Sequence, residues 1–206
     1  MRAVVIYESI YGNTHVIADA IARGLEPGNE VTVVAVAGAT QELLDGADLV
    51  VAGGPTHLHG MSHANTRRAA VKQEHKEPGP VPLDPDAEGP GLRDWFGSLG
   101  RVSVSAAAFD TRLSGPAAFT GRAAKGVARL LERHGLTLIA EPESFLVTKD
   151  NQLVPGEEDR AQEWGGLLAA KAVLASGSTA SGRTASGQHG VSQHRVKQHR
   201  QPRELT

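Results

Sequence analysis

Five short apolar segments alternate with helical patterns over most of the chain, and this alternation constrains the fold more than any other feature. The apolar segments span residues 3–7, 30–36, 49–53, 102–109 and 136–147. Apolar residues recur at helical spacing over 14–25, 40–46, 62–76, 118–134 and 157–174. Strands that are buried on both faces appear as continuous apolar runs, and helices connect them in parallel sheets. The sequence therefore predicts an α/β domain with a doubly wound, five-stranded parallel sheet.

Turn and capping residues agree with these boundaries. Thr40 can cap the second helix, Gly135 ends the fourth, and Pro155-Gly156 precede the fifth. Residues 76–91 hold five prolines and predict a surface loop that leads into a short helix around 92–99. From the sequence, this loop is either a plain connector or a segment that shapes the entrance of a site.

Composition limits the compartment and the domain organisation. The chain has no cysteine, which excludes disulfides and thiolate metal sites and fits a reducing cytoplasm. No apolar stretch approaches the roughly 20 residues that span a bilayer, and no signal-peptide pattern opens the chain. Residues 176–206 carry five basic residues and one acidic residue, so residues 1–175 carry a net charge of −6. We expect a folded domain over 1–175, a disordered basic tail over 176–206, and a cytoplasmic protein that binds neither membrane nor nucleic acid.

The loop after the first strand has the composition of a phosphate site. Residues 9–14 read Ser-Ile-Tyr-Gly-Asn-Thr, without a lysine, and a helix pattern follows directly. Free backbone N–H groups and the helix dipole favour an anion at a helix N-terminus. Ser9 and Thr14 add hydroxyl donors, Asn13 adds an amide, and Gly12 permits close approach of the backbone. The loop predicts a phosphate that is held mainly by dipoles.

Two other segments end predicted strands with small or polar residues. They are residues 53–61, which read Gly-Gly-Pro-Thr-His-Leu-His-Gly-Met, and residues 109–112, which read Phe-Asp-Thr-Arg. In open α/β sheets, ligands bind beyond the carboxyl ends of the strands. The three loops are thus expected to form one site.

Taken together, these three motifs resemble those of the flavodoxin family, which binds FMN at the corresponding loops. The match covers about residues 1–174 and rests on Ser9, Gly12 and Thr14, with the Gly-Gly-Pro-Thr and Phe-Asp-Thr-Arg segments. The resemblance implies the flavodoxin-like strand order 2-1-3-4-5, an FMN cofactor, and a redox protein partner for a monomer or dimer. It implies that the phosphate and the ring are held by Ser9, Ile10, Tyr11, Gly12, Asn13, Thr14, Pro55, Thr56, His57, Leu58, His59, Gly60, Phe109, Asp110 and Thr111.

The chain departs from the family in the residues that cover the flavin ring. The tryptophan and tyrosine that often stack on the ring are absent from these loops, which leaves His57, His59, Met61, Phe109 and Trp95 as candidates. Weaker stacking implies weaker retention of FMN. The net negative charge of residues 1–175 predicts acidic surroundings for the ring, and such surroundings would disfavour a negatively charged reduced flavin.

Other functions fit the sequence less well than an FMN-binding electron carrier. The histidines at 57, 59 and 63 have short spacing, as in metal sites, but the acidic ligand such a motif needs is missing, so no metal is expected. A receiver domain needs an acidic residue where strand three ends in Gly53-Gly54-Pro55, and a nucleoside triphosphatase needs a Gly-Lys-Ser/Thr loop. An FMN-binding electron carrier is the main prediction. The alternatives are an FMN-dependent quinone or porphyrinogen reductase, with His57 or His59 as proton donor, and a non-catalytic interaction module.

Overall fold

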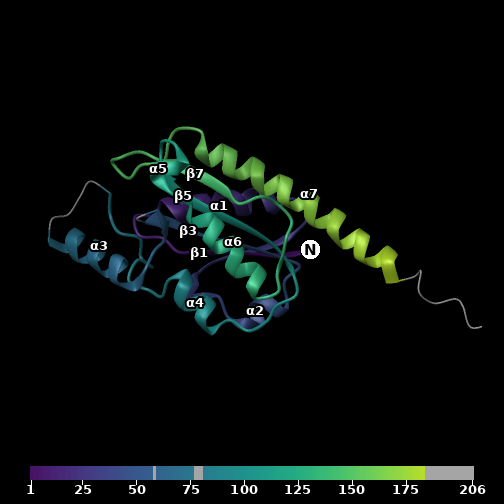
Figure 1. Ribbon diagram of the computed structural model, residues 1–206. Helices are drawn as coiled ribbons and strands as arrows, with labels where there is room; N and C mark the ends of the chain where they lie inside the picture. The colour runs from purple at the N-terminus through teal and green to yellow at the C-terminus, as the bar shows by residue number, and fades with distance from the viewer. Residues whose placement is uncertain (58, 77–80, 184–206) are drawn as a thin grey trace, which may run out of the picture.

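The computed structural model describes residues 1–57, 59–76 and 81–183, with the side chains of 177–183 excepted. A parallel sheet forms the centre of the molecule (Figure 1), in the order β2-β1-β3-β5 followed by β6 and β7. The main strands are β1 (Arg2–Tyr7), β2 (Glu30–Ala35), β3 (Leu49–His57), β5 (Ser105–Leu113), β6 (Thr137–Leu138) and β7 (Glu143–Val147). The predicted doubly wound sheet is confirmed. Its order 2-1-3-4-5 is also confirmed, with β5 as the fourth predicted strand and β6 and β7 in the position of the fifth.

The fifth position of the sheet is divided between two strands. β6 pairs with the first residues of β5, and β7 pairs with residues 109–113. Pro142 lies between them, and proline has no N–H group to donate to a neighbouring strand. A single strand over 136–147, as predicted, is therefore interrupted. A two-residue strand, β4 (Gly60–Met61), also forms a short antiparallel hairpin with the end of β3.

Helices cover both faces of the sheet. Side chains of α1 and α7 join one core cluster, and those of α2, α4 and α6 join the other. Figure 1 shows α7 beside α1, with α6 and α4 on the opposite side of the strands. The helices are α1 (Asn13–Leu25), α2 (Gln41–Asp45), α3 (Ala64–Lys76), α4 (Leu92–Ser98), α5 (Ala117–Thr120), α6 (Ala123–Arg133) and α7 (Glu157–Arg183), with a 3₁₀ turn at Val36–Gly38.

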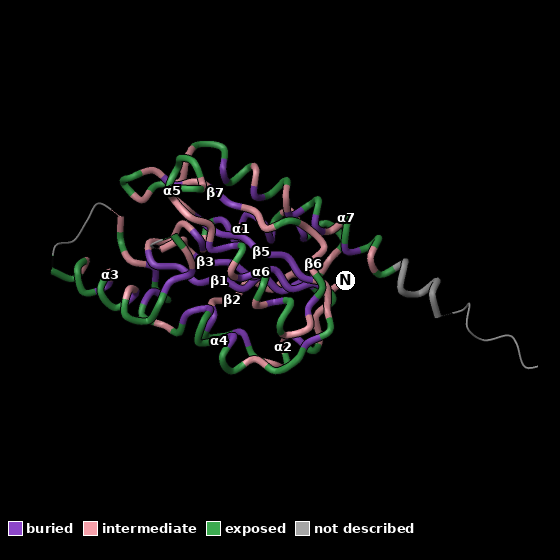
Figure 2. Tube along the Cα trace, in the orientation of Figure 1, coloured by how far each residue is buried: buried purple, intermediate pink, exposed green. Residues whose placement is uncertain are grey.

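The alternation of side chains along β1 explains the two cores. Ala3, Val5 and Tyr7 face α1 and α7, while Val4 and Ile6 face the other layer. Figure 2 shows the strands buried in the centre and the outer faces of the helices exposed. The helix α3 is mostly exposed, and only Arg67 and Val71 on it are buried.

The residues predicted to begin or end helices do so at three positions. Thr40 Oγ1 accepts a hydrogen bond from the Leu43 N–H at 3.4 Å, and Gly135 and Gly156 have positive φ values of 96° and 88°. The helix predicted over 118–134 is broken in two at Gly121, where φ is 78°. A Cβ there would lie 2.2 Å from the His59 Cα, so the chain must turn past the β3–β4 hairpin.

The C-terminal region differs in length from the prediction. The backbone of α7 continues to Arg183, whereas the sequence pattern ends at 174. The remainder of the expected tail, 184–206, lies outside the described residues. Within the described part of the chain, no helix has the length and apolarity needed to cross a membrane.

Candidate functional site at the carboxyl edge of the sheet

The three predicted loop segments meet at one cavity of about 320 Å³, although β3 continues through residues 53–57 and β5 through residues 109–113, beyond the predicted strand ends. The cavity lies beyond the carboxyl ends of β1, β3 and β5, which is where the topology of an open α/β sheet places ligands. It is lined by Ser9, Ile10, Tyr11, Asn13, Thr14, Pro55, Thr56, His57, Thr111, Arg112, Leu113, Val147, Lys149 and Asn151. The structure thus brings together residues from all three motifs.

The N-terminus of α1 is open toward this cavity. Gly12 precedes the helix with a left-handed φ of 80°, and a Cβ at this position would meet no atom within 4 Å. Gly12, the N-cap residue, has no side chain with which to cap the helix, and the first turn contains no acidic residue. The first N–H groups of a helix have no carbonyl partner within the helix. They are therefore free to bind an anion.

Ser9 is the second feature that indicates an anion. The residue is 3% exposed, and its Oγ has no hydrogen-bond partner among the described residues. A buried hydroxyl without a partner is costly, so such groups usually have a ligand or a water to bind. The orphaned Oγ lies on the same loop as the open helix N-terminus.

Two side-chain contacts hold the loops in register. The Thr14 and Thr111 hydroxyls are 2.8 Å apart and buried, and they connect the loop at residues 9–14 to the end of β5. Asn13 donates from Nδ2 to the Asn151 carbonyl at 2.9 Å. The Asn13 amide, expected as a phosphate donor, thus also fixes the turn that follows β7.

The sequence reasoning missed the contribution of the last strand. Val147, Lys149 and Asn151 line the cavity, together with Arg112 at the end of the third motif and Leu113 just beyond it. The rule that every strand ends at the same edge would have drawn attention to 147–151. Arg112 and Lys149 are the charged residues among those lining the cavity, so its immediate charge is positive. The acidic surroundings that were expected from the net charge are not found at the cavity.

Phe109 and Asp110 lie away from the cavity, contrary to expectation. Phe109 is fully buried in the core beneath α1, 6.3 Å from the Phe145 ring, and a Cβ on Gly53 would lie 2.4 Å from its ring. Asp110 points to the opposite face of the sheet, where its Oδ2 accepts from the Ala124 N–H at 2.7 Å and from Thr56 Oγ1 at 3.1 Å. Successive side chains of a strand face opposite sides, which accounts for both positions.

Three of the other four candidates for covering the ring, Trp95, Met61 and His59, also lie elsewhere. Trp95 is buried and donates from Nε1 to the Ala39 carbonyl at 3.0 Å, and Met61 is buried beside Gly126. His57 lines the cavity, whereas His59 and Gly60 line a separate groove next to α6. Leu58 lies outside the described residues. The described residues contain no cluster of three or more histidine, cysteine or acidic side chains that could hold a metal ion.

Comparison with known proteins agrees with the fold. The family model for flavodoxin matches residues 5–164. The chain belongs to the flavodoxin family. A search of curated proteins finds no match.

Solved flavodoxins share the fold at low sequence identity. A flavodoxin from the domain Archaea is 19% identical, with a TM-score of 0.56 over 84% of this chain and 99% of the other. Flavodoxin 1 from Bacillus cereus is 21% identical, with a TM-score of 0.54 over 84% and 98% of the two chains. A flavodoxin from Streptococcus pneumonia TIGR4 is 18% identical, with a TM-score of 0.58 over 83% and 99%. These likenesses support the flavodoxin fold.

In this flavodoxin-family chain the proline-rich segment supports the loop at residues 9–14, in which a phosphate site was predicted. The Asp84 N–H donates to the Ile10 carbonyl at 2.8 Å, and Asp84 Oδ2 lies 3.1 Å from His15 Nδ1. Tyr7 donates from its hydroxyl to Asp86 Oδ2 at 3.0 Å, and its ring stacks on His15 at 4.2 Å. The segment therefore positions the site and is more than a plain connector.

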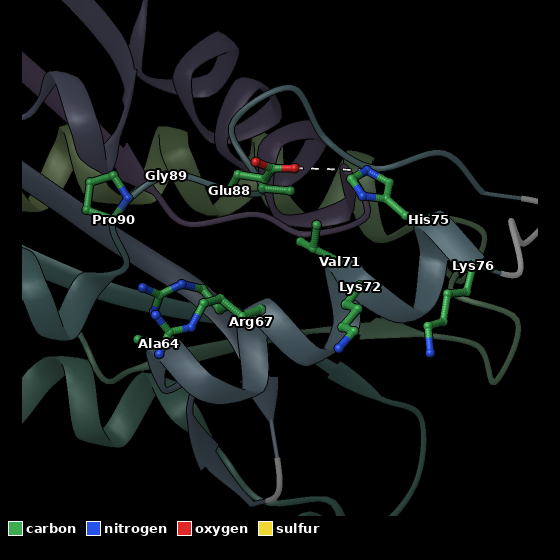
Figure 3. Close-up of a pocket in the computed structure, with 11 residues that line it drawn as sticks. Ala64, Arg67, Val71, Lys72, His75, Lys76, Glu88, Gly89 and Pro90 are labelled. Carbon is green, nitrogen blue, oxygen red and sulfur yellow. Dashed lines mark ion pairs between the residues drawn. The ribbon is translucent and has the colours of Figure 1, made fainter.

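A second hollow, of about 570 Å³, lies between α3 and residues 87–90. Figure 3 shows Arg67, Lys72 and Lys76 projecting from α3, with Pro90 across the hollow. His75 Nε2 lies 3.9 Å from Glu88 Oε1 and connects its two sides. None of the three predicted loops lines this hollow, so we do not assign it to the cofactor.

Asp110 gives the domain a distinct pH dependence. Burial raises the pKa of its carboxyl above the usual range, against the hydrogen bonds from the Ala124 N–H and Thr56. A raised pKa in the folded state means that the folded chain binds the proton more tightly than the unfolded chain. This contribution to stability is present below the unfolded pKa of about 3.9 and is lost as pH rises through the folded pKa.

We expect Asp110→Asn to remove this dependence. Relative to the variant, the natural chain should lose stability as the pH rises from about 4 through the raised pKa of the folded state, because the buried carboxyl must ionise. Urea unfolding at a series of pH values measures the difference. Asp150→Asn, in an exposed turn, is the control, and its profile of stability against pH should run parallel to that of the natural chain. Parallel profiles for Asp110→Asn would contradict the argument.

Proposed function

We propose that the cavity binds FMN and that the protein transfers electrons to or from a redox protein partner. The observation that carries the proposal is the buried, unpartnered Ser9 Oγ beside the open N-terminus of α1, at a cavity formed by the strand ends. Membership in the flavodoxin family supports a flavin as the ligand. We expect the protein to act in the cytoplasm.

The residues present fit such a cofactor. The phosphate would be held by Ser9, the N–H groups of residues 10–15 and the Tyr11 hydroxyl, with Thr14 fixed by Thr111. Lys149, exposed at the cavity, adds a positive charge near the same loop, because its turn is connected to Asn13 through Asn151. The segments at 55–57 and 111–113, with Val147, would flank the ring. The phosphate would therefore be held by the N–H dipoles of the predicted loop and by the charge of Lys149, which the sequence motif does not include.

Bound FMN would take up and return one or two electrons, and the chain would bind and orient it. Positive charge from Arg112 and Lys149 stabilises a more negative reduced cofactor. Tyr11 and His57 are the lining residues with aromatic rings. Affinity therefore depends strongly on the phosphate loop.

His57 also favours a second function, reduction of a quinone. It is half-buried on the cavity surface, where an imidazole could donate a proton to a bound substrate. Sustained oxidation of NADH or NADPH with a quinone by the FMN-loaded protein would support this enzyme. Reduction by a separate reductase protein alone would support the carrier.

Ser9→Ala tests the site directly. The free energy of unfolding without FMN should stay the same or rise, because the change removes a buried hydroxyl that has no partner. The Kd for FMN should rise about 10- to 100-fold, since a hydrogen bond to a charged group is lost. Flavin fluorescence titration and urea unfolding measure the two quantities.

Ser105→Ala is the matched control, because Ser105 begins β5 at the opposite edge of the sheet. Its Kd for FMN should match that of the natural chain. If the natural chain bound no FMN, the proposed function would be refuted. Equal Kd values for Ser9→Ala and the natural chain would refute the role of the Ser9 hydroxyl.

A further inference from the structure

A strongly basic groove of about 610 Å³ lies between α4, α5 and α6 on the side of the β3–β4 hairpin away from the FMN cavity. We call it the basic groove. The cations that line it are Arg93, Arg122, Lys125, Arg129 and Arg133, and none of its lining residues is acidic. Residues 1–175 carry a net charge of −6, so this concentration of positive charge runs against the average of the domain.

Three of these cations are available to a partner. Lys125, Arg129 and Arg133 are spaced four residues apart on α6 and therefore lie on one face of the helix, one turn after another. All three are exposed, and none has a hydrogen bond or ion pair within the described part of the chain. The apolar face of α6 is buried against the sheet, so the charged face points outward. The stripe contributes no ion pair to the described fold.

The other two cations stabilise the shape of the groove. Arg93 donates from Nε to the Ser62 carbonyl at 3.0 Å, and Arg122 donates from Nε to Ser144 Oγ at 3.1 Å. These bonds hold α4 and the start of α6 against neighbouring segments. Met61 lies against Gly126, with its Sδ 3.1 Å from where a Cβ on that glycine would be. The groove is therefore a surface fixed by hydrogen bonds, with cations along its α6 side that are exposed and unpaired among the described residues.

The groove lies next to the cofactor site. His57 lines the FMN cavity, and its partner across the hairpin, Gly60, lines the groove. His59 also bridges to Gly121, between α5 and α6. A molecule bound in the groove would contact the same hairpin that lines the FMN cavity.

Exposed apolar side chains beside the groove favour a protein partner. Phe119 on α5 is 76% exposed, and its neighbours Ala117 and Ala118 line the groove. Leu113, at the cavity, is 45% exposed. Aromatic anchors next to a charged surface are typical of protein interfaces, where charge steers association and apolar contacts hold the complex.

We propose that the basic groove and Phe119 form the docking surface for the acidic face of a small electron-transfer protein. The proposal rests on the proposed function for its purpose, although the docking itself does not require the flavin. Positive charge on α6 would attract the acidic partner and orient it over the hairpin beside the cofactor. Phe119 would enter an apolar patch on the partner.

Binding of an acidic plant-type [2Fe–2S] ferredoxin tests the proposal. Titration calorimetry at low ionic strength, about 0.01 M, should detect binding that weakens at about 0.15 M. The triple variant Lys125→Glu/Arg129→Glu/Arg133→Glu should weaken it at least about tenfold at low ionic strength. Phe119→Ala should weaken it about tenfold at both ionic strengths, because its contact is apolar.

Lys171→Glu is the matched control, since Lys171 is exposed on α7, on the other face of the sheet. It should change the affinity less than about twofold. All variants should keep the natural circular dichroism spectrum and Kd for FMN. The titration is repeated on flavin-free protein, so that a chain that binds ferredoxin without binding FMN separates this proposal from the proposed function.

Three results would overturn the proposal. The first is the absence of ferredoxin binding at low ionic strength. The second is an equal loss in Lys171→Glu and in the triple variant. The third is binding of a single-stranded oligonucleotide in place of ferredoxin, which would assign the groove to nucleic acid.

Discussion

Replacing Arg67 with alanine is expected to lower the free energy of unfolding by about 3–5 kcal/mol, because it leaves a buried carboxylate without its partner. Arg67 is 6% exposed. Its Nη1 lies 3.9 Å from Glu8 Oε1 and 3.3 Å from Ser62 Oγ, and its Nη2 lies 2.7 Å from Asp94 Oδ2. Urea unfolding of the full chain measures the loss.

Without Arg67, the hydrogen-bond donors that remain on the buried Glu8 carboxylate within the described residues are uncharged groups, which do not balance its charge. Glu8 Oε2 accepts from the Leu92 N–H at 2.8 Å, and Ser62 Oγ donates to Glu8 Oε1. The Gly91 N–H and the Arg67 guanidinium hold the pKa of Asp94 below its usual range. One arginine thus connects the residue before the phosphate loop with α3 and α4.

Arg68→Ala is the control on the same helix. Arg68 is exposed and donates to Asn65 Oδ1 at 2.6 Å, so its removal should cost less than about 1 kcal/mol. Adding Glu8→Gln to Arg67→Ala should recover part of the stability, since the uncompensated charge is then removed. Equal losses of unfolding free energy for the two arginine variants would show that the buried Arg67–Glu8 pair stabilises the fold no more than an exposed contact does.

The second large effect is expected where α7 crosses α1. A Cβ on Gly165 would lie 2.2 Å from the Ile21 carbonyl oxygen, and one on Gly24 would lie 2.0 Å from the Gln162 carbonyl oxygen. Backbone atoms cannot move aside as a flexible side chain can. Gly165→Ala should therefore force the helices apart and cost about 1–3 kcal/mol in unfolding free energy.

The adjacent glycine provides a control of opposite sign. A Cβ on Gly166 would lie 3.8 Å from the Gly24 carbonyl oxygen, which is an ordinary contact. Gly166→Ala should stabilise the protein by up to about 1 kcal/mol, because alanine favours a helix more than glycine does. Thermal and urea unfolding of both variants should give shifts in opposite directions. Shifts of the same sign would contradict the close approach of the two helices.

The sequence predicted the fold well because its signals are local and repeated. Buried strands and amphipathic helices each follow from a few neighbouring residues, as 3–7 and 14–25 illustrate. The interruption at Pro142 and the break at Gly121 depend on one residue each and on the segments packed against them. Such positions are decided by tertiary contacts.

The candidate site was predictable in part for the same reason. Residues 9–14 combine a strand end, a glycine turn and a helix start, which can be recognised in sequence. Lys149 and Asn151 carry no motif of their own and enter the cavity only through the sheet order. Phe109 belongs to the third motif, but it lies within β5, two residues before Thr111, and its side chain is buried in the core. Knowledge of a motif did not specify the direction of its side chains.

The hydrogen bond from Asn13 to Asn151 has a thermodynamic consequence. It joins residues 138 positions apart, and the cavity between them needs the first and last strands of the sheet in place. An unfolded or truncated chain would retain the phosphate-loop sequence without the cavity. Cofactor affinity and domain stability are therefore coupled: a ligand at 100 times its Kd would add about 2.7 kcal/mol to the stability of the whole domain. Saturation with its cofactor would make this protein a more stable molecule as well as a chemically active one.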